Sequence, residues 1–478
     1  MDRKALLRHM ASLATDADAT PDAAAVFLPL TQHRLALRPD VVVIEGMRGA
    51  GKTALFRLVN QLDDRVPKFF EDGAIPPAVW IDGFSEEKLH PAPAVVDQFV
   101  GALPVARDSQ LRAFWAVHLL HCLTRAGVPK ATLPPPLAGL LRERGHDIGA
   151  WSLAGEQAIG QVMSLLDQID DAVGASGRFV FVTYDYLDRL GLLDVSRVTR
   201  TRLVRALVAL WLSNSTRLRA IRGKIFLRPD LFEEAERSFP DASKLRPRSV
   251  SLDWDTEALY RLLLRHLANA GPHVLEFRQW LLKAGVRLMK HGATEEFGVI
   301  PGPMGVEEQA RFAAELAGEV MGSGAKKGYT HRWIPARLKD AGGRVAPRSI
   351  LRLIGYAAKG ALREPPGGGP LMHPTSLVGA MPDVSRDRVN ELREEYSFVD
   401  RLSNLDGETM LMERRRVVSL LSNPTTGTDT FGDDGASVLD ELERIGVIQV
   451  RADGRIDVPD IYRYGYGIKR KGGAAGAR

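Results

Sequence analysis

The chain has 478 residues, of which 45% are hydrophobic and 26% are charged, and this length and composition predict a soluble protein of two to four domains. It has no apolar run long enough for a transmembrane helix, and its polar start, MDRKALLRHM, is unlike a secretory signal, so we expect a cytoplasmic protein with no membrane partner. The net charge of +5 is too small to indicate nucleic acid, and the single cysteine, Cys122, excludes an internal disulfide and a thiolate metal cluster.

Shifts in composition and pattern divide the chain into predicted parts. Two of them carry most of the length, an α/β core and a segment whose periodicity is almost wholly helical. A PPGGGP run marks a linker after the helical segment. The predicted parts are a helical segment at 1–28, the core at 29–235, an all-helical lid at 236–364, a C-terminal domain at 371–468 and a disordered basic tail at 469–478.

Within the core, four apolar segments read as strands, at residues 40–46, 78–84, 178–185 and 223–230. Near-continuous apolar runs are typical of parallel strands that are buried on both faces of a sheet. The helical stretches between them are long enough for crossover connections. We therefore predict a three-layer α/β domain with a parallel sheet, and we expect its ligand crevice at the carboxyl ends of the strands.

The strongest motif follows the first of these strands. The sequence GMRGAGKT at 46–53 matches G-x-x-x-x-G-K-[ST] and is followed by the helical pattern TALFRLVNQL. Such a loop points backbone amides at phosphate oxygens, with Lys52 reaching the β- and γ-phosphates and Thr53 binding Mg²⁺. The alternative is a glycine-rich turn with nothing bound. The predicted ATP-binding residues are Gly46, Arg48, Gly49, Ala50, Gly51, Lys52, Thr53 and Ala54.

A second metal ligand is expected at the end of a neighbouring strand. The segment FVFVTYDYLDRL places Asp185 there, so Asp185 is predicted to bind Mg²⁺ directly or through water; capping of the following helix is the alternative. Asp82 also follows a strand, but a turn or a helix cap is the favoured interpretation for it. His118 and His121 have a spacing that allows metal binding on a helix face, yet core packing is favoured for both.

GMRGAGKT and FVFVTYDYLDRL together resemble the P-loop ATPases of the additional-strand class, which includes AAA+ and STAND proteins, and in particular the KAP type with its D-D-L-D-R motif. Asp185, Leu187, Asp188 and Arg189 match that motif, but Tyr186 stands where the class has a second acid. That acid commonly polarises the attacking water. The resemblance thus implies an ATP hydrolase (ATPase), either with Asp188 in this role or with slow turnover.

The same resemblance assigns sensor roles to two arginines. Arg228 ends the strand GKIFLR, where such ATPases carry a sensor of the γ-phosphate; pairing with Asp230 or Asp185 is the alternative. Arg348 begins a helix in the predicted lid, as does the second sensor arginine of AAA+ lids, with a surface position as the alternative.

The pattern SVLDELERIG-VIQVRA-DG-RIDVP, a helix followed by two strands around a turn, resembles the end of a winged-helix domain. Such domains bind DNA or proteins, and the candidate DNA contacts are Arg451, Arg455, Lys469, Arg470 and Lys471. The predicted recognition helix carries three acids and one base, which argues against a strong DNA footprint.

These features predict an ATP-dependent conformational switch with Mg²⁺ as cofactor and with a homo-oligomer or an effector protein as partner. The resemblance suggests a setting in signalling or antiphage defence. The alternative is a DNA-associated ATPase similar to replication initiators or transposition regulators. A small-molecule kinase is a third possibility, but it gives the helical and winged segments no role.

Overall fold

The structure is a computed structural model of the chain. It describes all residues except 1, 17–21, 129–136, 140, 142–146, 191–195, 238–244, 294, 323–326, 365–368, 426–428, 430 and 471–478, and it leaves out the side chains of 15, 16, 106 and 196–200 as well. Most of the predicted linker, and the predicted tail from Lys471 onward, therefore lie outside the described residues.

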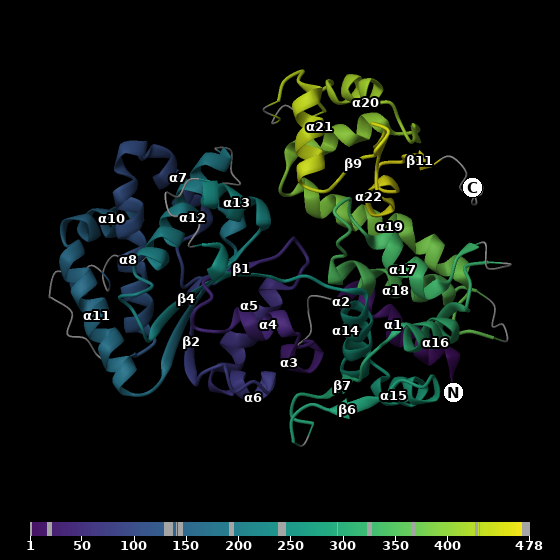
Figure 1. Cartoon of the computed structure of the whole chain (residues 1–478), viewed down its shortest axis with the longest axis horizontal. Coiled ribbons are helices and arrows are strands. Elements are labelled where there is room, and N and C mark those ends of the chain that lie inside the picture. The colour runs from purple at the N-terminus through teal and green to yellow at the C-terminus, as the bar shows by residue number, and fades with distance from the viewer. Residues whose placement is uncertain are drawn as a thin grey trace. The chain divides into compact units, whose positions relative to one another are not determined.

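Contacts divide the chain into two units. The sheet unit consists of Pro29–Met47 and Gly51–Asp253, and the helical unit consists of Met1–Leu28, Arg48–Ala50 and Trp254–Arg478. The predicted segment 1–28 therefore groups with the helical unit, and the predicted lid and C-terminal domain share one hydrophobic core there. Figure 1 shows the elements of each unit.

The sheet unit is built on a parallel sheet in the order β2-β3-β4-β1-β5. Three of its strands lie within the predicted segments, and β4 overlaps its segment, 223–230, but begins before it. β5, which pairs with β1, was not predicted. The strands are β1 (Val43–Glu45), β2 (Ala78–Phe84), β3 (Phe179–Tyr184), β4 (Ile221–Leu227) and β5 (Ser249–Ser251). The helices are α4 (Thr31–Ala36), α5 (Lys52–Leu62), α6 (Val66–Phe70), α7 (Pro93–Ala102), α8 (Asp108–Arg125), α10 (Ile148–Gln157), α11 (Ile159–Ala175), α12 (Ser196–Ser213) and α13 (Pro229–Arg237).

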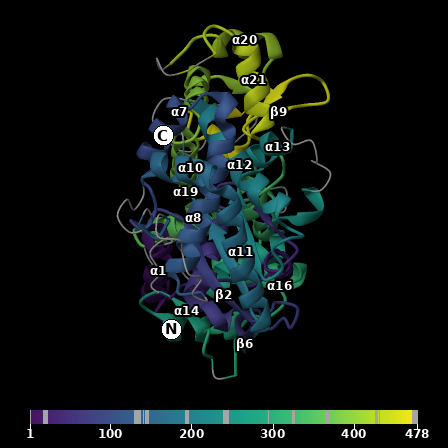
Figure 2. The ribbon, with the colours of Figure 1, turned by 90° about the vertical axis from the view of Figure 1, so that its left-hand side faces the viewer.

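Helices cover both faces of this sheet, as its apolar strands require. On one face, Phe226 of β4 packs edge-on against Phe56 of α5. On the other, Val182 of β3 and Ile225 of β4 belong to one buried cluster with apolar side chains of α8, α11 and α12. Figure 1 shows these three helices on the side of the sheet away from α5, and in Figure 2 they face the viewer. The arrangement is compatible with the predicted three-layer core.

Cys122 lies on α8, in the layer of helices that packs on the second of these faces, and it is fully buried. Burial raises the pKa of its thiol to about 12. The thiol is therefore protonated at neutral pH in the structure, which does not favour a nucleophilic role.

The helical unit is mainly α-helical, and its described residues form three short two-stranded sheets. Its helices are α1 (Arg3–Ala11), α2 (Leu13–Asp16), α3 (Ala23–Val26), α14 (Thr256–Asn269), α15 (Val274–Lys283), α16 (Val306–Ala317), α17 (Thr330–Leu338), α18 (Pro347–Ala361), α19 (Pro374–Arg393), α20 (Arg414–Leu421), α21 (Gly435–Arg444) and α22 (Asp460–Arg463). Its strands are β6 (Leu288–Lys290), β7 (Val299–Pro301), β8 (Thr409–Met410), β9 (Gln449–Val450), β10 (Ile456–Asp457) and β11 (Lys469–Arg470). Among the described residues, no helix has both the length and the apolar character needed to cross a membrane.

The structure corrects two details of the prediction for this unit. The predicted lid is not all-helical, because β6 and β7 form an antiparallel hairpin within it. Each strand has three residues, too few to produce a periodicity that can be recognised in the sequence. Lys469 and Arg470 were predicted to begin a disordered tail, but they pair with β8 as β11.

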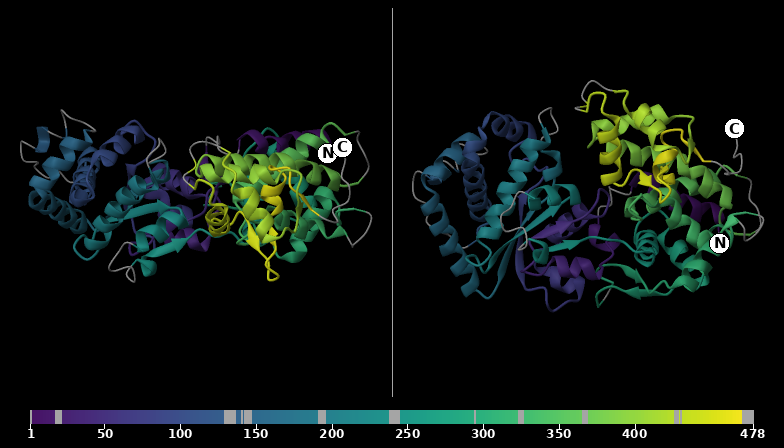
Figure 3. Two further views of the ribbon diagram at one scale, coloured as in Figure 1. Left: turned by 90° about the horizontal axis from the view of Figure 1, so that it is seen from above. Right: turned by 45° about the horizontal axis from the view of Figure 1, so that its top comes forward.

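The predicted helix, strand, turn and strand near the C-terminus are present as α21, β9 and β10. Gly454, in the turn between the two strands, has φ 79°, a conformation that a residue with a side chain rarely adopts. The hairpin projects from its neighbours within the helical unit (Figures 2 and 3).

Candidate functional site

The GMRGAGKT loop connects the carboxyl end of β1 to the start of α5. The amide of Gly46 donates to the carbonyl of Leu227 on β4, which fixes the start of the loop to the sheet. Gly49 and Gly51 have φ angles of 81° and 99°, which favour glycine strongly. The two glycines let the backbone curl before α5, and the amides at the start of an eleven-residue helix are suited to bind an anion.

Lys52 is the first residue of α5, and its side chain turns back over this loop. Its Nζ donates to the carbonyl oxygens of Gly46, at 2.6 Å, and Met47, at 3.3 Å. The ammonium group therefore lies beside the loop that the motif assigns to phosphate binding. Thr53 is the next residue along α5, and its side chain is hydrogen-bonded to Asp185, the second part of the site.

Asp185 follows β3 directly and is 3% exposed. Its carboxylate is hydrogen-bonded to the Thr53 side chain, and among the described residues its Oδ2 has no hydrogen-bond partner. A buried carboxylate oxygen without a donor, next to a hydroxyl, is the type of oxygen set that Mg²⁺ prefers. The residues present therefore fit the predicted metal.

The electrostatics of Asp185 agree with a site that needs a cation. Burial, and next the nearby charge of Asp188, raise its pKa to about 6; the hydrogen bond from Thr53 and the charge of Lys52 act in the opposite direction. The structure thus brings Lys52 and Thr53 together with Asp185 and Asp188, which come much later in the sequence.

Tyr186 has a left-handed backbone conformation, with φ 61° and ψ 13°. A non-glycine residue in this region costs about 1 kcal/mol or more, and such strain is often found at functional sites. Its hydroxyl accepts a hydrogen bond of 2.9 Å from Arg57 of α5, and burial raises its pKa, so the phenol remains neutral. A neutral phenol is a poor substitute for a carboxylate as a base. Asp188 is half-buried in a short 3₁₀ helix, Leu187–Arg189.

Arg228 is buried just after β4, and it forms the ion pair that the sequence left open as an alternative to sensing. Its Nε and one terminal nitrogen donate to the two carboxylate oxygens of Asp230, at 3.0 and 2.5 Å. A bidentate pair of this kind holds the guanidinium in a fixed orientation. For Arg228 to contact a γ-phosphate, this pair would have to open.

Arg348 is the second residue of α18 in the helical unit, and it belongs to a cluster around one buried carboxylate. Arg348 and Arg388 donate to Glu391 at 3.0 and 2.9 Å. Burial acts to raise the pKa of Glu391, but the charges of the two arginines outweigh it and the net pKa is lowered. Arg348 thus pairs with an acid on α19, and its side chain is 30% exposed.

The tip of the loop, Arg48–Ala50, groups with this same unit. Arg48 forms ion pairs with Glu394 and, at 3.0 Å, with Glu395, which follow α19. A Cβ atom at Gly49 would lie 3.2 Å from that of Ala346, so a larger residue would have little room. Within the helical unit, therefore, α18 and the end of α19 provide the neighbours of these three residues.

The arginines predicted to contact DNA pair with acids in the structure. Arg451 and Arg470 both bond to Asp457, and Arg455 bonds to Asp453. Lys471 lies outside the described residues. Pairing reduces the positive potential of the β9–β10 hairpin, which does not favour phosphate binding there.

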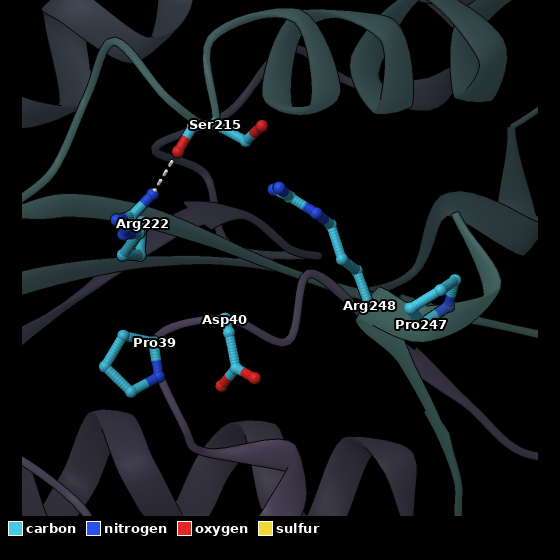
Figure 4. A pocket seen from close by; sticks show the side chains of 6 residues that line it. All are labelled: Pro39, Asp40, Ser215, Arg222, Pro247 and Arg248. Carbon is cyan, nitrogen blue, oxygen red and sulfur yellow. Dashed lines mark hydrogen bonds between the residues drawn. The ribbon is translucent and has the colours of Figure 1, made fainter. Parts of the chain in front are cut away.

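A separate hollow of about 440 Å³ lies at the amino ends of the strands, opposite the ends that the loop follows. Figure 4 shows Arg222 and Arg248 at its wall, with Arg222 bonded to the Ser215 carbonyl at 2.8 Å. Asp40 precedes β1 and Arg248 precedes β5, so the hollow is at the amino ends of parallel strands. The GMRGAGKT loop follows the carboxyl end of β1, and the hollow is therefore not part of the candidate nucleotide site.

Two features of the site were not predicted from the sequence. The bond from Arg57 to Tyr186 joins α5 to the segment after β3, and no local signal marks it. The pair of Arg388 with Glu391 has the i, i+3 spacing of a helix, which could have been read from the sequence as a stabilising pair. No family model, no curated protein and no solved structure matches the chain.

Proposed function

We propose that the chain binds ATP and Mg²⁺ at the GMRGAGKT loop, hydrolyses the ATP slowly and acts as a nucleotide-dependent switch. The observation that carries the proposal is the meeting of Lys52, Thr53 and Asp185, where a buried carboxylate oxygen has no hydrogen-bond partner among the described residues. A glycine-rich turn that binds nothing would not require a buried carboxylate beside it.

Each residue has a task that follows from its position. The loop amides and Lys52 would bind the phosphates, and Thr53 and Asp185 would hold Mg²⁺. The metal would neutralise phosphate charge when bound. Asp188 is the acid available to orient the attacking water, because the phenol of Tyr186 is neutral and bonded to Arg57.

The strand order supports the resemblance to the additional-strand class. β4 lies between β1, which precedes the loop, and β3, which precedes Asp185. One strand thus separates the two strands that carry the proposed site.

In the proposed switch, Arg228 exchanges Asp230 for the γ-phosphate, and the helical unit contributes Arg348 in a closed state. A γ-phosphate then supplies contacts that exist in only one state, which is the physical basis of a nucleotide switch. We propose an oligomer or an effector protein as the partner, and a cytoplasmic signalling or antiphage-defence setting, on the resemblance to KAP and STAND proteins. A DNA-associated ATPase has less support, because Arg451, Arg455 and Arg470 are paired with acids.

The proposal is tested by the Mg²⁺ dependence of ATP binding to the full chain. We expect Mg²⁺ to increase ATP affinity in the parent, and Thr53→Ala to reduce that increase about tenfold, because the hydroxyl is a metal ligand. Thr124→Ala is the matched control, since Thr124 bonds its own helix at the Leu120 carbonyl. Titration calorimetry with and without Mg²⁺ measures the effect. ATP binding that is absent from the parent would refute the proposed function.

Tyr186 provides a test of slow turnover. Tyr186→Glu restores an acid next to Asp185, and we expect kcat for ATP hydrolysis to rise about tenfold or more, since a positioned general base contributes at least that much. Tyr186→Gln is the control, because glutamine has the size of glutamate but no charge. Phosphate release under saturating ATP measures the rate. An equal rise in both variants would show that loss of the Arg57 bond, and not the new carboxylate, is responsible.

A further inference from the structure

Three potential metal ligands meet in the core of the sheet unit, apart from the nucleotide site. They are His90, His118 and Cys122, and one ligand atom from each lies within 4.8 Å of the others. His118 and Cys122 are one turn apart on α8, and the Cys122 sulfur is 3.6 Å from His118 Nδ1. His90 comes from the segment after β2. His121, which was considered with His118 in the sequence, packs against Trp151 with its ring tilted and is not part of this group.

The position of His90 resembles that of a metal ligand supported by a carboxylate. Its Nε2 lies 3.0 Å from Asp82 Oδ1, and the second oxygen of Asp82 accepts a 2.6 Å bond from Ser85. An Nε2 that donates to a carboxylate leaves the lone pair on Nδ1, and metal-binding histidines usually have such a partner. Within the part of the chain that the structure describes, His90 Nδ1 is buried and has no hydrogen-bond partner.

Packing alone does not account for this arrangement. The surroundings are aromatic, with Phe84, Phe114 and Trp115 against the two histidines. A buried polar atom that lacks a partner costs about 1–3 kcal/mol, and an apolar side chain of similar size would avoid that cost. Convergence of a second histidine and a thiol on the same point is what metal binding requires.

We propose that His90, His118 and Cys122 bind one Zn²⁺ ion, with Asp82 holding His90 in orientation. Imidazole and thiolate ligands favour zinc over Mg²⁺ or Ca²⁺, which prefer oxygen. On binding, a zinc–sulfur bond replaces the bond from sulfur to hydrogen, and the proton leaves to solvent. The thiolate and the Asp82 carboxylate then balance the two charges of the ion, which a buried site needs. Three protein ligands leave one position of a tetrahedral ion for water.

The burial of these side chains indicates how an ion reaches the site. The His90 side chain is 1% exposed, but that of Asp82 is 20% exposed. Asp82 is thus the edge of the group that meets solvent, and its negative charge would attract a cation there.

The test uses the full chain after removal of metal with a chelator, without nucleotide. Co²⁺ replaces Zn²⁺ as a spectroscopic probe, because a cobalt–thiolate bond produces a charge-transfer absorption. We expect one equivalent of Co²⁺ to produce this absorption and one equivalent of Zn²⁺ to remove it. Cys122→Ser should abolish the absorption, and His90→Gln should weaken binding at least about 100-fold. His121→Gln is the matched control and should bind as the parent does.

Asp82→Asn keeps all three ligands and is the milder variant, with an expected loss of about 10- to 100-fold in Zn²⁺ affinity. Circular dichroism of each variant shows whether it folds. Absence of the absorption in the parent overturns the proposal, and so does unchanged affinity in a folded His90→Gln variant. Uptake of Cu⁺ without Co²⁺ or Zn²⁺ would overturn the assignment to zinc.

Discussion

Replacement of Lys52 by alanine is expected to weaken ATP binding about 10- to 100-fold. A hydrogen bond to a charged group contributes about 1.5–3 kcal/mol, and each 1.4 kcal/mol is a factor of ten in affinity. Lys52 Nζ, which now donates to Gly46 and Met47, would make such bonds to phosphate oxygens. The variant loses this cation and keeps the loop glycines, and we therefore expect it to fold normally.

The measurement is ATP affinity by titration calorimetry, with thermal unfolding as a check on the fold. Lys68→Ala is the control, because Lys68 is an exposed lysine on α6 of the same unit. It removes one positive charge from α6, which is not part of the loop. Equal ATP affinity in the parent and in Lys52→Ala would contradict the assignment of the loop to phosphate binding.

The second large effect is on stability, and we expect Asp185→Asn to stabilise the metal-free protein by about 3 kcal/mol above about pH 6. The pKa of Asp185 is raised from 3.8 to about 6 by burial and then by Asp188. The folded state therefore holds this proton more tightly than the unfolded state does. As pH rises between these two values, the unfolded chain ionises first, and the parent loses stability that the neutral asparagine retains.

Denaturant unfolding with a chelator present, at about pH 4 and about pH 8, tests this prediction. The gain should be small at the lower pH and complete at the higher one. Asp171→Asn, at an exposed position on α11, should show no such gain. A gain of the same size at both pH values would show that ionisation of Asp185 is not its cause. The same variant should lose Mg²⁺-dependent hydrolysis, because an amide is a weaker ligand than a carboxylate.

The fold was predictable where local sequence carries a strong signal. Four strands of the sheet are long or flanked by clear breakers, and each lies within its predicted segment or, for Ile221–Leu227, overlaps it. The strand Ser249–Ser251 and the hairpin of Leu288–Lys290 with Val299–Pro301 were missed, because three residues form a strand only when a distant partner supplies hydrogen bonds. The grouping of 1–28 with the helical unit depends on buried contacts with remote helices, such as that of His9 with Leu267.

The candidate site also has residues that the sequence predicted and partners that it did not. Gly46, Lys52 and Thr53 lie in one short motif, so their spacing in the sequence already predicts the loop and the chemistry proposed for it. Asp185 was predicted by the rule that ligands gather at the carboxyl ends of parallel strands, and the structure places it against Thr53. The sequence did not specify which acid pairs with Arg228 or with Arg348, because several acids could pair with each of them.

The sequence by itself therefore determined the GMRGAGKT motif, the α/β class of the core and the position of Asp185 at a strand end, because these follow from residues near one another in the chain. The tertiary structure decided which distant side chains meet. Asp230 pairs with Arg228, Arg57 holds Tyr186, and His90 joins His118 and Cys122 in an apolar core. Such meetings depend on how strands and helices pack, and packing is fixed by the burial of the whole core rather than by any local pattern.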